Sequence, residues 1–424
     1  MRPGSVVVVP CLAALVLAFG ASMGCAATIA FVAPDTGIPA GPMCCEPPAS
    51  LQGARVCKLT NDGTHRLGQV DDDQRLWWWN DAVAPGKTVE YAVSSASENA
   101  KPKAVNIEQT SPETIAVTLN GKPFTTLNFK KNEPRVYLYP VIGPTEVGVT
   151  RDHIMRDNPL EKDNRRQDHP HHRSLWTAYG DVRIKDFDKQ GYDFWAEPKD
   201  RKLPRQILTK VVRTVSGPVF GQIEATIEWQ TPEGQRVFTE DRTYTFFVGN
   251  HDERMIDLRN RFTFGDMDVK FGDTKESGIL SLRLAVTMDE VGVKTPQPLH
   301  GQATNSRGGI GAGSTGQCWG RPAEWCDYVG PLDGQTVGVA VFDHPRNFRH
   351  PTRWHIRDYG LYTANPFGLA AFTGDKSQDG SHVWKKGESV ELNYRVVIHK
   401  GDTNAARVAD QWKLYSSPPK ISLK

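Results

Sequence analysis

The sequence predicts an all-β protein in which a large antiparallel two-sheet β-sandwich follows a small N-terminal β unit. Short runs of alternating or β-branched residues recur after residue 50 and are separated by Gly, Pro, Asn and Asp, which is typical of strands joined by turns. Only residues 404–415 have an apolar spacing that predicts a helix of about three turns. So many strands in one chain of 424 residues favour a large sandwich over a small barrel.

The strand pattern is clearest in eight segments, which lie at residues 114–119, 206–215, 222–230, 242–248, 254–262, 279–286, 336–342 and 389–398. Asn120 and Gly121 stand between the first of these segments and a further apolar run at 124–129. Both residues tolerate the positive φ angles of a type I′ turn, so the sequence predicts a two-residue hairpin there.

The first 27 residues have the features of an export signal. Arg2 supplies a positive start, an apolar run follows at 6–19, and small residues precede residue 28. We therefore expect an exported protein, periplasmic or extracellular, with lipidation at Cys25 as the alternative to plain secretion. No later segment approaches the ~20 continuous apolar residues of a spanning helix, so we expect no integral membrane segment in the mature chain.

The remaining chain divides into three expected parts. Residues 28–50 contain five prolines and no apolar periodicity, which predicts a linker. Residues 51–111 predict the small β unit, and residues 112–418 predict the main sandwich domain. The small unit contains three consecutive tryptophans at 77–79. In an alternating strand at least one indole faces a core, which favours packing or a domain interface over a sugar-stacking platform.

Composition and cysteine content set further bounds. The formal net charge is +2 and no block of like charge occurs, which gives no electrostatic reason to expect nucleic acid as a partner. Cys318 and Cys326 flank a short segment, which predicts either a small disulfide-closed loop or two unpaired buried thiols.

Six of the twelve histidines fall in two short windows. The first window, residues 168–173, contains His169, His171 and His172, and an extended backbone would place His169 and His171 on one face. Two imidazoles at this spacing can bind one metal or act together on one substrate. The alternative is a structural segment in which the flanking aspartate and arginine pair and the histidines donate to backbone carbonyls.

The second window, residues 343–359, follows an expected strand and should form a polar loop at a sheet end, where binding groups are commonly mounted. Its four arginines, three histidines and two aspartates predict an anionic or polyhydroxylated ligand. The alternative is a solvated loop held together by ion pairs. Trp354 and Tyr359 would be poorly placed in such a loop.

A third polar segment, residues 271–278, directly precedes the expected strand 279–286. Glu276, beside a glycine turn at a strand edge, is a candidate general base or metal ligand. A surface turn in which Glu276 pairs locally with Lys275 is the alternative.

In these stretches the sequence resembles the PmoA-like family, also called methane oxygenase PmoA-like, which is largely of unknown function. The resemblance rests on ordered motifs at residues 137–140, 168–176 (DHPHHRSLW), 180–182, 193–195, 271–276, 343–345, 357–360 and 365–368. It covers about residues 114–371 and leaves out the small N-terminal unit. Ser174 and Ser277 stand where relatives are expected to carry glycine.

The resemblance implies two kinds of chemistry. The family name implies methane oxidation, but the methane monooxygenase subunit of that name is an integral membrane protein, unlike this chain as expected above. The family is also similar to the galactose-mutarotase-like supersandwich, whose members use a histidine and a carboxylate for acid/base chemistry at sugars.

These features together predict a secreted carbohydrate-active enzyme with hydrolase, lyase or epimerase chemistry on a sugar or keto-sugar. His171 or His172 is the expected general acid, and Glu276 is the expected base. The expected substrate-binding residues are Arg173, Trp195, Lys275, His344, His350, Arg353, Trp354, Asp358 and Tyr359.

Two alternatives stay open. An iron- or copper-dependent oxygenase would use His169, His171 and His344 as metal ligands, and a divalent metal would then be the cofactor. A non-catalytic secreted protein would bind a small molecule or a glycan by stacking sugar rings on Trp78 or Trp354.

Overall fold

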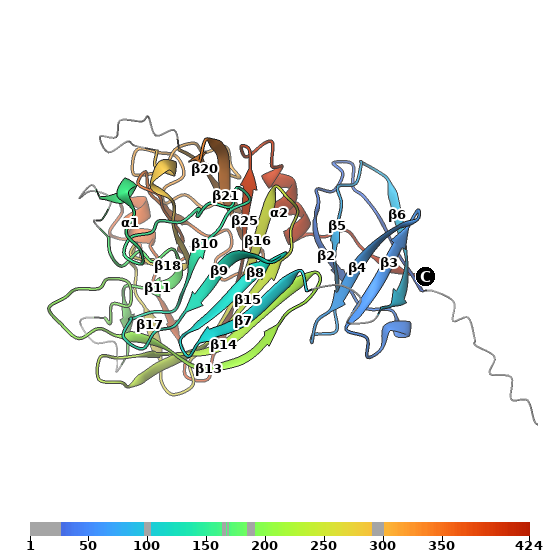
Figure 1. Ribbon diagram of the computed structural model, residues 1–424. Coiled ribbons are helices and arrows are strands. Elements are labelled where there is room, and N and C mark those ends of the chain that lie inside the picture. Colours follow the sequence, from blue (N-terminus) through green and yellow to red (C-terminus); the bar gives the residue numbers. More distant parts are fainter. Residues whose placement is uncertain (1–26, 97–102, 163–166, 168, 185–190, 291–300) are drawn as a thin grey trace, which may run out of the picture.

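The computed structural model describes residues 27–96, 103–162, 167, 169–184, 191–290 and 301–424. Its regular structure consists of two eight-stranded sheets, a seven-stranded sheet and a three-stranded sheet. Figure 1 shows the seven-stranded sheet beside the larger body that the other sheets form. The predicted all-β class with a large sandwich and a small N-terminal unit is confirmed.

The two eight-stranded sheets form the sandwich and are named here after a central strand of each. The β11 sheet has the order β22 (Trp354–Ile356), β23 (Leu361–Ala364), β18 (Ser277–Arg283), β11 (Leu175–Tyr179), β10 (Tyr137–Val141), β9 (Lys122–Asn128), β8 (Thr114–Leu119) and β7 (Val105–Ser111). The β15 sheet has the order β13 (Arg205–Val215), β14 (Phe220–Gln230), β15 (Arg236–Phe247), β16 (Glu253–Thr263), β25 (Ser389–Lys400), β21 (Gln335–Asp343), β20 (Trp325–Leu332) and β19 (Gln302–Asn305).

Smaller elements complete the main domain. A three-stranded sheet has the order β12 (Val182–Arg183), β17 (Val269–Phe271) and β24 (His382–Trp384). The helices are α1 (Leu369–Thr373) and α2 (Val408–Ser416), so a helix is confirmed within the predicted segment near the C-terminus. No helix in the described ranges is long and apolar enough to cross a membrane.

The predicted hairpin between β8 and β9 is confirmed. Asn120 and Gly121 have φ angles of 49° and 78°, and Leu119 pairs with Lys122 across the turn. Positive φ at both central residues is the conformation that an Asn-Gly turn of this type requires.

The linker predicted for residues 28–50 is wrong. The small sheet has the order β2 (Gly41–Cys45), β5 (Leu76–Asn80), β4 (Thr64–Val70), β3 (Val56–Asn61), β6 (Thr88–Ser95), β1 (Ala27–Val32) and β26 (Ser422–Leu423). Ile29 and Phe31 alternate into its core, a period that the neighbouring prolines obscured. Pro42 is tolerated in β2 because β2 is an edge strand, where a missing backbone N–H breaks no ladder.

The boundary expected at residue 111 is also wrong. Residues 105–111 form β7 of the β11 sheet, and Val105 and Ile107 pack in the core of the main domain. The small sheet instead gains the end of the chain, because Leu423 of β26 pairs with Ile29 of β1. A two-residue strand leaves no detectable pattern in a sequence.

The three tryptophans of β5 serve packing on both faces of the small sheet. Trp78 has 0% exposure and lies in the core of that sheet. Trp77 contacts Phe220 and Phe247 of the β15 sheet at ring-centroid distances of 6.4 and 5.6 Å. Trp79 packs against the same apolar cluster, so the interpretation as core and domain interface is confirmed.

Helix α2 strengthens the connection between the small sheet and the sandwich. In Figure 1 it lies between the β15 sheet and the small sheet. Leu414 packs into the core of the small sheet, whereas Val408 and Trp412 pack against the interface cluster that also holds Trp77. The same helix therefore contributes apolar side chains to both units.

The five cysteines in the described ranges are all unpaired, so the interpretation of Cys318 and Cys326 as buried thiols holds and the disulfide-closed loop does not form. Both side chains are buried. Burial raises the pKa of the Cys318 thiol to about 12 and raises that of the Cys326 thiol well above its ordinary value.

Replacing Trp78 by alanine should destabilise the small sheet strongly. The indole fills a core position, and truncating a buried tryptophan typically costs about 3–5 kcal/mol. Urea unfolding followed by fluorescence should show this loss, while Val32→Ala, at a position 57% exposed, should leave the midpoint unchanged. A loss below about 1 kcal/mol for Trp78→Ala would contradict the packing described above.

Candidate active site

The outer face of the β11 sheet, opposite the sandwich core, is covered by loops. Leu175 and Tyr179 of β11 point into the core, whereas Trp176 and Ala178 belong to a separate apolar cluster on the other face. The partners of Trp176 in this cluster include Tyr137 of β10, Leu361 of β23, and Trp195, Tyr139 and Tyr359. Because loops cover this face, all five residues of β11 are buried and its sequence shows no polar alternation.

The first histidine window forms a turn on this face and not the extended strand expected from its spacing. The backbone N–H of His172 donates to the carbonyl of His169 at 3.0 Å. The turn gathers all three rings, with centroid distances of 4.6 Å between His169 and His172 and 4.4 Å between His171 and His172. Asp168, the expected partner of Arg173, lies outside the described residues.

Arg173 holds this turn in place. Its guanidinium donates to both carboxylate oxygens of Glu197 at 3.0 and 2.7 Å and lies over the ring of Tyr137 at 5.5 Å. Arg135 also pairs with Glu197 at 3.0 Å and donates to the carbonyls of His171 and Trp195. Arg173 was expected to bind substrate, but these contacts make it a positioning residue, because its donors are engaged by protein carboxylates.

Ser174 follows this network with a φ angle of 57°, in the left-handed region that favours glycine. Its hydroxyl donates to Thr150 at 2.7 Å, and its carbonyl accepts the backbone N–H of Arg283 on β18. These contacts fix the junction between the histidine turn and β11. The glycine expected in relatives at this position therefore has a backbone reason.

His172 is buried at the centre of the cluster. Its ring stacks on Trp176 with a centroid distance of 5.5 Å, and its Nδ1 lies 2.7 Å from a guanidinium nitrogen of Arg283. Burial and the adjacent guanidinium hold the pKa of His172 well below its ordinary value, so the ring is neutral at pH 7.

The third segment places a carboxylate beside this cluster. Asn365 donates to the carbonyls of Thr274 and Lys275 at 2.9 and 3.2 Å, and Asp273 accepts from one backbone N–H group in α1 and one in the loop that follows it. These bonds fix the position of Glu276, which pairs with Lys275 and has a side chain 42% exposed. A ligand in solvent can therefore reach this carboxylate.

His355, which belongs to β22 of the β11 sheet, lies near Glu276. It is 1% exposed and lies on β22 between Trp354 and Ile356, which both point into the core. Partial burial raises the pKa of Glu276, but the hydrogen bond from Lys275 and the nearby rings of His355 and His171 outweigh it and lower this pKa overall. The carboxylate is therefore ionised at neutral pH.

The two imidazoles near Glu276 are neutral at the same pH. Burial, helped by Arg135 and His169, lowers the pKa of His171 to about 3. Burial also lowers the pKa of His355 to about 4, against the pull of Glu276. An imidazolium at His171 or His172 was expected as general acid, but in this geometry both rings can offer only a neutral N–H at pH 7.

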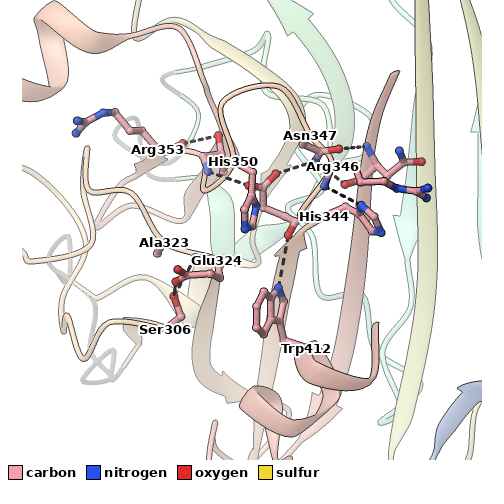
Figure 2. Close-up of polar contacts among 12 residues, drawn as sticks. Ser306, Ala323, Glu324, His344, Arg346, Asn347, His350, Arg353 and Trp412 are labelled. Atoms are coloured by element: carbon pink, nitrogen blue, oxygen red, sulfur yellow. Dashed lines mark hydrogen bonds and ion pairs between the residues drawn. The ribbon is translucent and has the colours of Figure 1, made fainter. Parts of the chain in front are cut away.

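The second histidine window is divided between two places. Its first part, residues 343–352, forms a loop around the buried carboxylate of Asp343, which accepts from Asn347, His350 and the backbone of Thr352 at 2.7–2.8 Å (Figure 2). This part matches the interpretation of a loop held by polar contacts. Its last part carries His355 and Tyr359 to the outer face of the β11 sheet.

Tyr359 and Trp195 lie with the first window, as expected for ligand-binding residues. Tyr359 stacks on His169 with a centroid distance of 5.2 Å, and the guanidiniums of Arg283 and Arg357 lie 4.6 and 5.1 Å from its ring. Trp195 lies 6.2 Å from His171 between ring centroids. Lys275 reaches the site through its pair with Glu276.

The other expected ligand-binding residues lie elsewhere. His344 contacts Tyr415 of α2 and lines a cleft between the small sheet and the sandwich. His350 is engaged by Asp343, and Arg353 donates to the carbonyl of Gly320, away from His344 in Figure 2.

Trp354 of the second window also differs from expectation. Trp354 has 0% exposure and donates to the carbonyl of Ala323 from inside the core, so it cannot stack on a sugar, and neither can Trp78. The backbone carbonyl of Asp358 accepts from Glu290 and Tyr328. Alternation along β22 explains the difference, because Trp354 and His355 must face opposite sides of the sheet.

The expected metal set is not assembled. His169 and His171 lie together, with ring centroids 5.5 Å apart, but His344 belongs to the cleft described above. Within the described part of the chain, no group of three or more His, Cys, Asp or Glu side chains has a metal-binding arrangement.

The sequence did not predict that His355, Trp176 and Arg283 belong to this site. His355 could have been found from the alternation Trp-His-Ile, since the two apolar neighbours define the core side. Trp176 stands in the motif at 168–176, but only the two-sided burial of β11 shows that it belongs to the outer face. Arg283 carries no sequence signal for its contact with His172, 111 residues away.

Comparison with known proteins identifies the family of this chain and supplies no activity for it. A family model described as a family of unknown function (DUF6807) matches residues 114–413. The chain belongs to this family. The match covers most of the sandwich domain and leaves out the small sheet, because strands β1 to β6 precede residue 114 and β26 follows residue 413. No curated protein matches the chain.

One solved structure that resembles the chain is titled a protein in the glycosyl hydrolase family 38 from Enterococcus faecalis. The TM-score is 0.36 with 10% sequence identity, and the match covers 94% of this chain and 47% of that chain. The chain thus spans about half the length of that protein. A likeness at this score carries no argument about fold or activity.

Replacing Glu197 by alanine should destabilise the protein, because it would leave Arg135 and Arg173 buried without their shared carboxylate. Breaking a buried ion pair from one side typically costs about 3–5 kcal/mol, which chemical denaturation would measure. Lys122→Ala, which removes an exposed pair with Glu146, is the control and should leave the unfolding midpoint unchanged. Equal effects of the two substitutions would contradict the positioning role.

The stability of the protein should fall in mild acid partly because of His355. Its folded pKa of about 4 lies below the unfolded value, so below pH 6.5 the unfolded state binds the proton first and folding loses free energy. Between pH 7 and pH 5, urea titrations should show His355→Gln losing about 2 kcal/mol less than the unsubstituted chain. His65→Gln, at an exposed position, should behave like the unsubstituted chain, and parallel curves for all three would contradict the burial effect.

Proposed function

We propose that this protein is an exported carbohydrate-active enzyme that performs acid/base chemistry on the outer face of the β11 sheet. One observation carries the proposal: an ionised and solvent-reachable Glu276 lies beside the neutral imidazoles of His171 and His355. Ionisable groups whose pKa values are displaced by burial and by nearby charges are frequent at acid/base sites.

Each group has a role that its protonation state supports. Glu276 accepts a proton from a sugar hydroxyl or from a carbon next to a carbonyl group, because it is a carboxylate at neutral pH. His171 donates its neutral N–H to the oxygen on which negative charge develops. His355 is fully buried near Glu276 and neither of its ring nitrogens has a hydrogen-bond partner in the described part of the chain, so it is given no contact with the substrate.

A sugar suits the walls of this site. Tyr139 and Tyr359, which are only partly buried, pack against the buried Trp176 and Trp195 and offer aromatic rings beside the polar groups. Aromatic rings bind the apolar C–H faces of sugars, while a few placed polar groups fix the hydroxyls. The sequence resemblance to the PmoA-like family and its mutarotase-like relatives agrees with acid/base chemistry at sugars, and it supports the proposal by analogy only.

The proposal is tested with Glu276→Gln, which keeps the shape of the side chain and removes its basicity. On a panel of glycans, aldoses and keto-sugars, any turnover by the unsubstituted protein should fall about 10²–10⁴-fold, the usual contribution of a general base. His65→Gln is the matched control at an exposed site outside this face and should keep full activity.

Two outcomes would contradict the proposal. Unchanged turnover by Glu276→Gln would remove the proposed base. A ligand that binds tightly but is recovered unaltered after long incubation would point to a glycan-binding protein without catalysis.

A further inference from the structure

A cleft lies between the small sheet and the face of the β15 sheet that points away from the sandwich core. Its volume is about 540 Å³, within the range of about 300–1,000 Å³ that is usual for ligand sites. The small sheet contributes Arg75 to its walls, the β15 sheet contributes Asn393 and Arg395, and the end of α2 contributes Tyr415. Glu276 belongs to the other side of the sandwich, beside the β11 sheet, so the cleft is separate from the acid/base site.

Arg395 places a guanidinium in this cleft that the protein uses only in part. The residue is 4% exposed, and its Nε and Nη2 atoms donate to the two carboxylate oxygens of Asp257 at 2.6 and 2.8 Å. The guanidinium lies over the rings of Phe247 and Tyr415, at 5.4 and 4.6 Å from their centroids. Its Nη1 atom forms no hydrogen bond with the described residues and is not enclosed, so it is open to a ligand in the cleft.

Two further donors lie beside Arg395. Nδ1 of His344 accepts the backbone N–H of Arg346 at 3.1 Å (Figure 2), so the proton of the neutral ring resides on Nε2. Burial and the guanidinium of Arg346 lower the pKa of His344, which keeps the ring neutral at pH 7. Tyr415 lies 5.3 Å from His344 between ring centroids, and its hydroxyl is likewise unused by the described residues. Three groups that can donate therefore gather at one end of the cleft.

Acceptors line the same cleft. The backbone carbonyl of Asn393 accepts from His344, and the side-chain amide of Asn393 donates to Glu391, which leaves its side-chain oxygen without a donor in the described ranges. Glu391 and Asp73 are exposed. The described lining contains four arginines and four carboxylates, namely Arg75, Arg259, Arg346 and Arg395, and Asp71, Asp73, Asp257 and Glu391. Because these formal charges cancel, the cleft has no net charge that would favour an ion.

We propose that this cleft binds a neutral oligosaccharide. A sugar hydroxyl both donates and accepts hydrogen bonds, so a chain of sugars can pair with Arg395, His344 and Tyr415 at one end and with the acceptors along the cleft. An apolar ligand would bury the same groups without partners, and each would then cost free energy. An anion or a cation would meet its own charge as often as the opposite one.

The test is calorimetric titration of the full chain carrying Glu276→Gln, which lacks the proposed base and therefore should not consume the probe. The neutral probes are cellotetraose, maltotetraose, xylotetraose and mannotetraose, and tetragalacturonate is the acidic counterpart. At least one neutral tetrasaccharide should bind, and tetragalacturonate should bind no more tightly than that one, because the lining has no net charge.

Two substitutions locate the binding in the cleft. Tyr415→Phe and His344→Phe keep an aromatic ring and remove a donor, so each should weaken binding about two- to ten-fold, the usual effect of losing one hydrogen bond. His382→Phe is the matched control, because His382 is also partly buried but lies on β24 against Phe348 and Trp384, outside the cleft. This control should leave the affinity unchanged.

If the cleft variants do not fold, histidine ring signals in proton NMR spectra of the Glu276→Gln protein replace them. The signals of His344 should move when the tetrasaccharide is added, because its ring lines the cleft, and those of His382 should stay. Signals of His344 that do not respond would contradict binding in the cleft.

The outcomes separate this inference from the proposed function. Failure of all four neutral tetrasaccharides to bind, tighter binding of tetragalacturonate, or an affinity that Tyr415→Phe and His344→Phe leave unchanged overturns the inference, even if Glu276-dependent turnover is found. Binding that depends on Tyr415 and His344 supports it even if no substrate is turned over, in which case the proposed catalysis fails alone.

Discussion

The ion-pair network around Glu197 is the interaction on which the arrangement of the outer face depends, because it joins segments that share no strand. Glu197 binds Arg173 at the end of the histidine turn and Arg135 just before β10. Arg135 in turn holds the carbonyls of His171 and Trp195. All three charged side chains are nearly buried, so removing any one of them would leave a buried charge without its partner in this network. This network therefore holds the rings of His169, His171 and His172 in contact with one another.

Both faces of the β11 sheet are covered, one by the sandwich core and the other by the loops that carry this site. On β11 and β22 the residues that face the core are large and apolar, while Trp176 and His355 face outward beneath the loops. Burial of the outward residues then determines their protonation. Histidines that would titrate near neutrality in water remain neutral here, and the exposed Glu276 remains ionised.

The small sheet is attached to the sandwich and kept apart from the outer face. Trp77 packs on the β15 sheet, the sheet opposite to the one that carries the histidine turn. The last strand of the small sheet, β26, pairs with β1, so this sheet is complete only when these two distant segments of the sequence have come together. His344 lines the cleft at this junction and therefore does not lie with His169 and His171, although the three were expected to bind one metal together.

Local sequence patterns were enough to predict the β class, the hairpin at Asn120-Gly121 and the segments that supply His171, Glu276 and Tyr359, because alternation, turn chemistry and clustered polar residues are local properties. The sequence could not show that residues 28–50 belong to a sheet, since their prolines obscure the alternation and their main partner strands lie at residues 88–95 and 76–80. It could not separate Trp354 from His355 or find Arg283 either. Those assignments depend on which face of a strand is covered and on contacts across more than a hundred residues, such as that of Arg283 with His172, and neither is a local property of the chain.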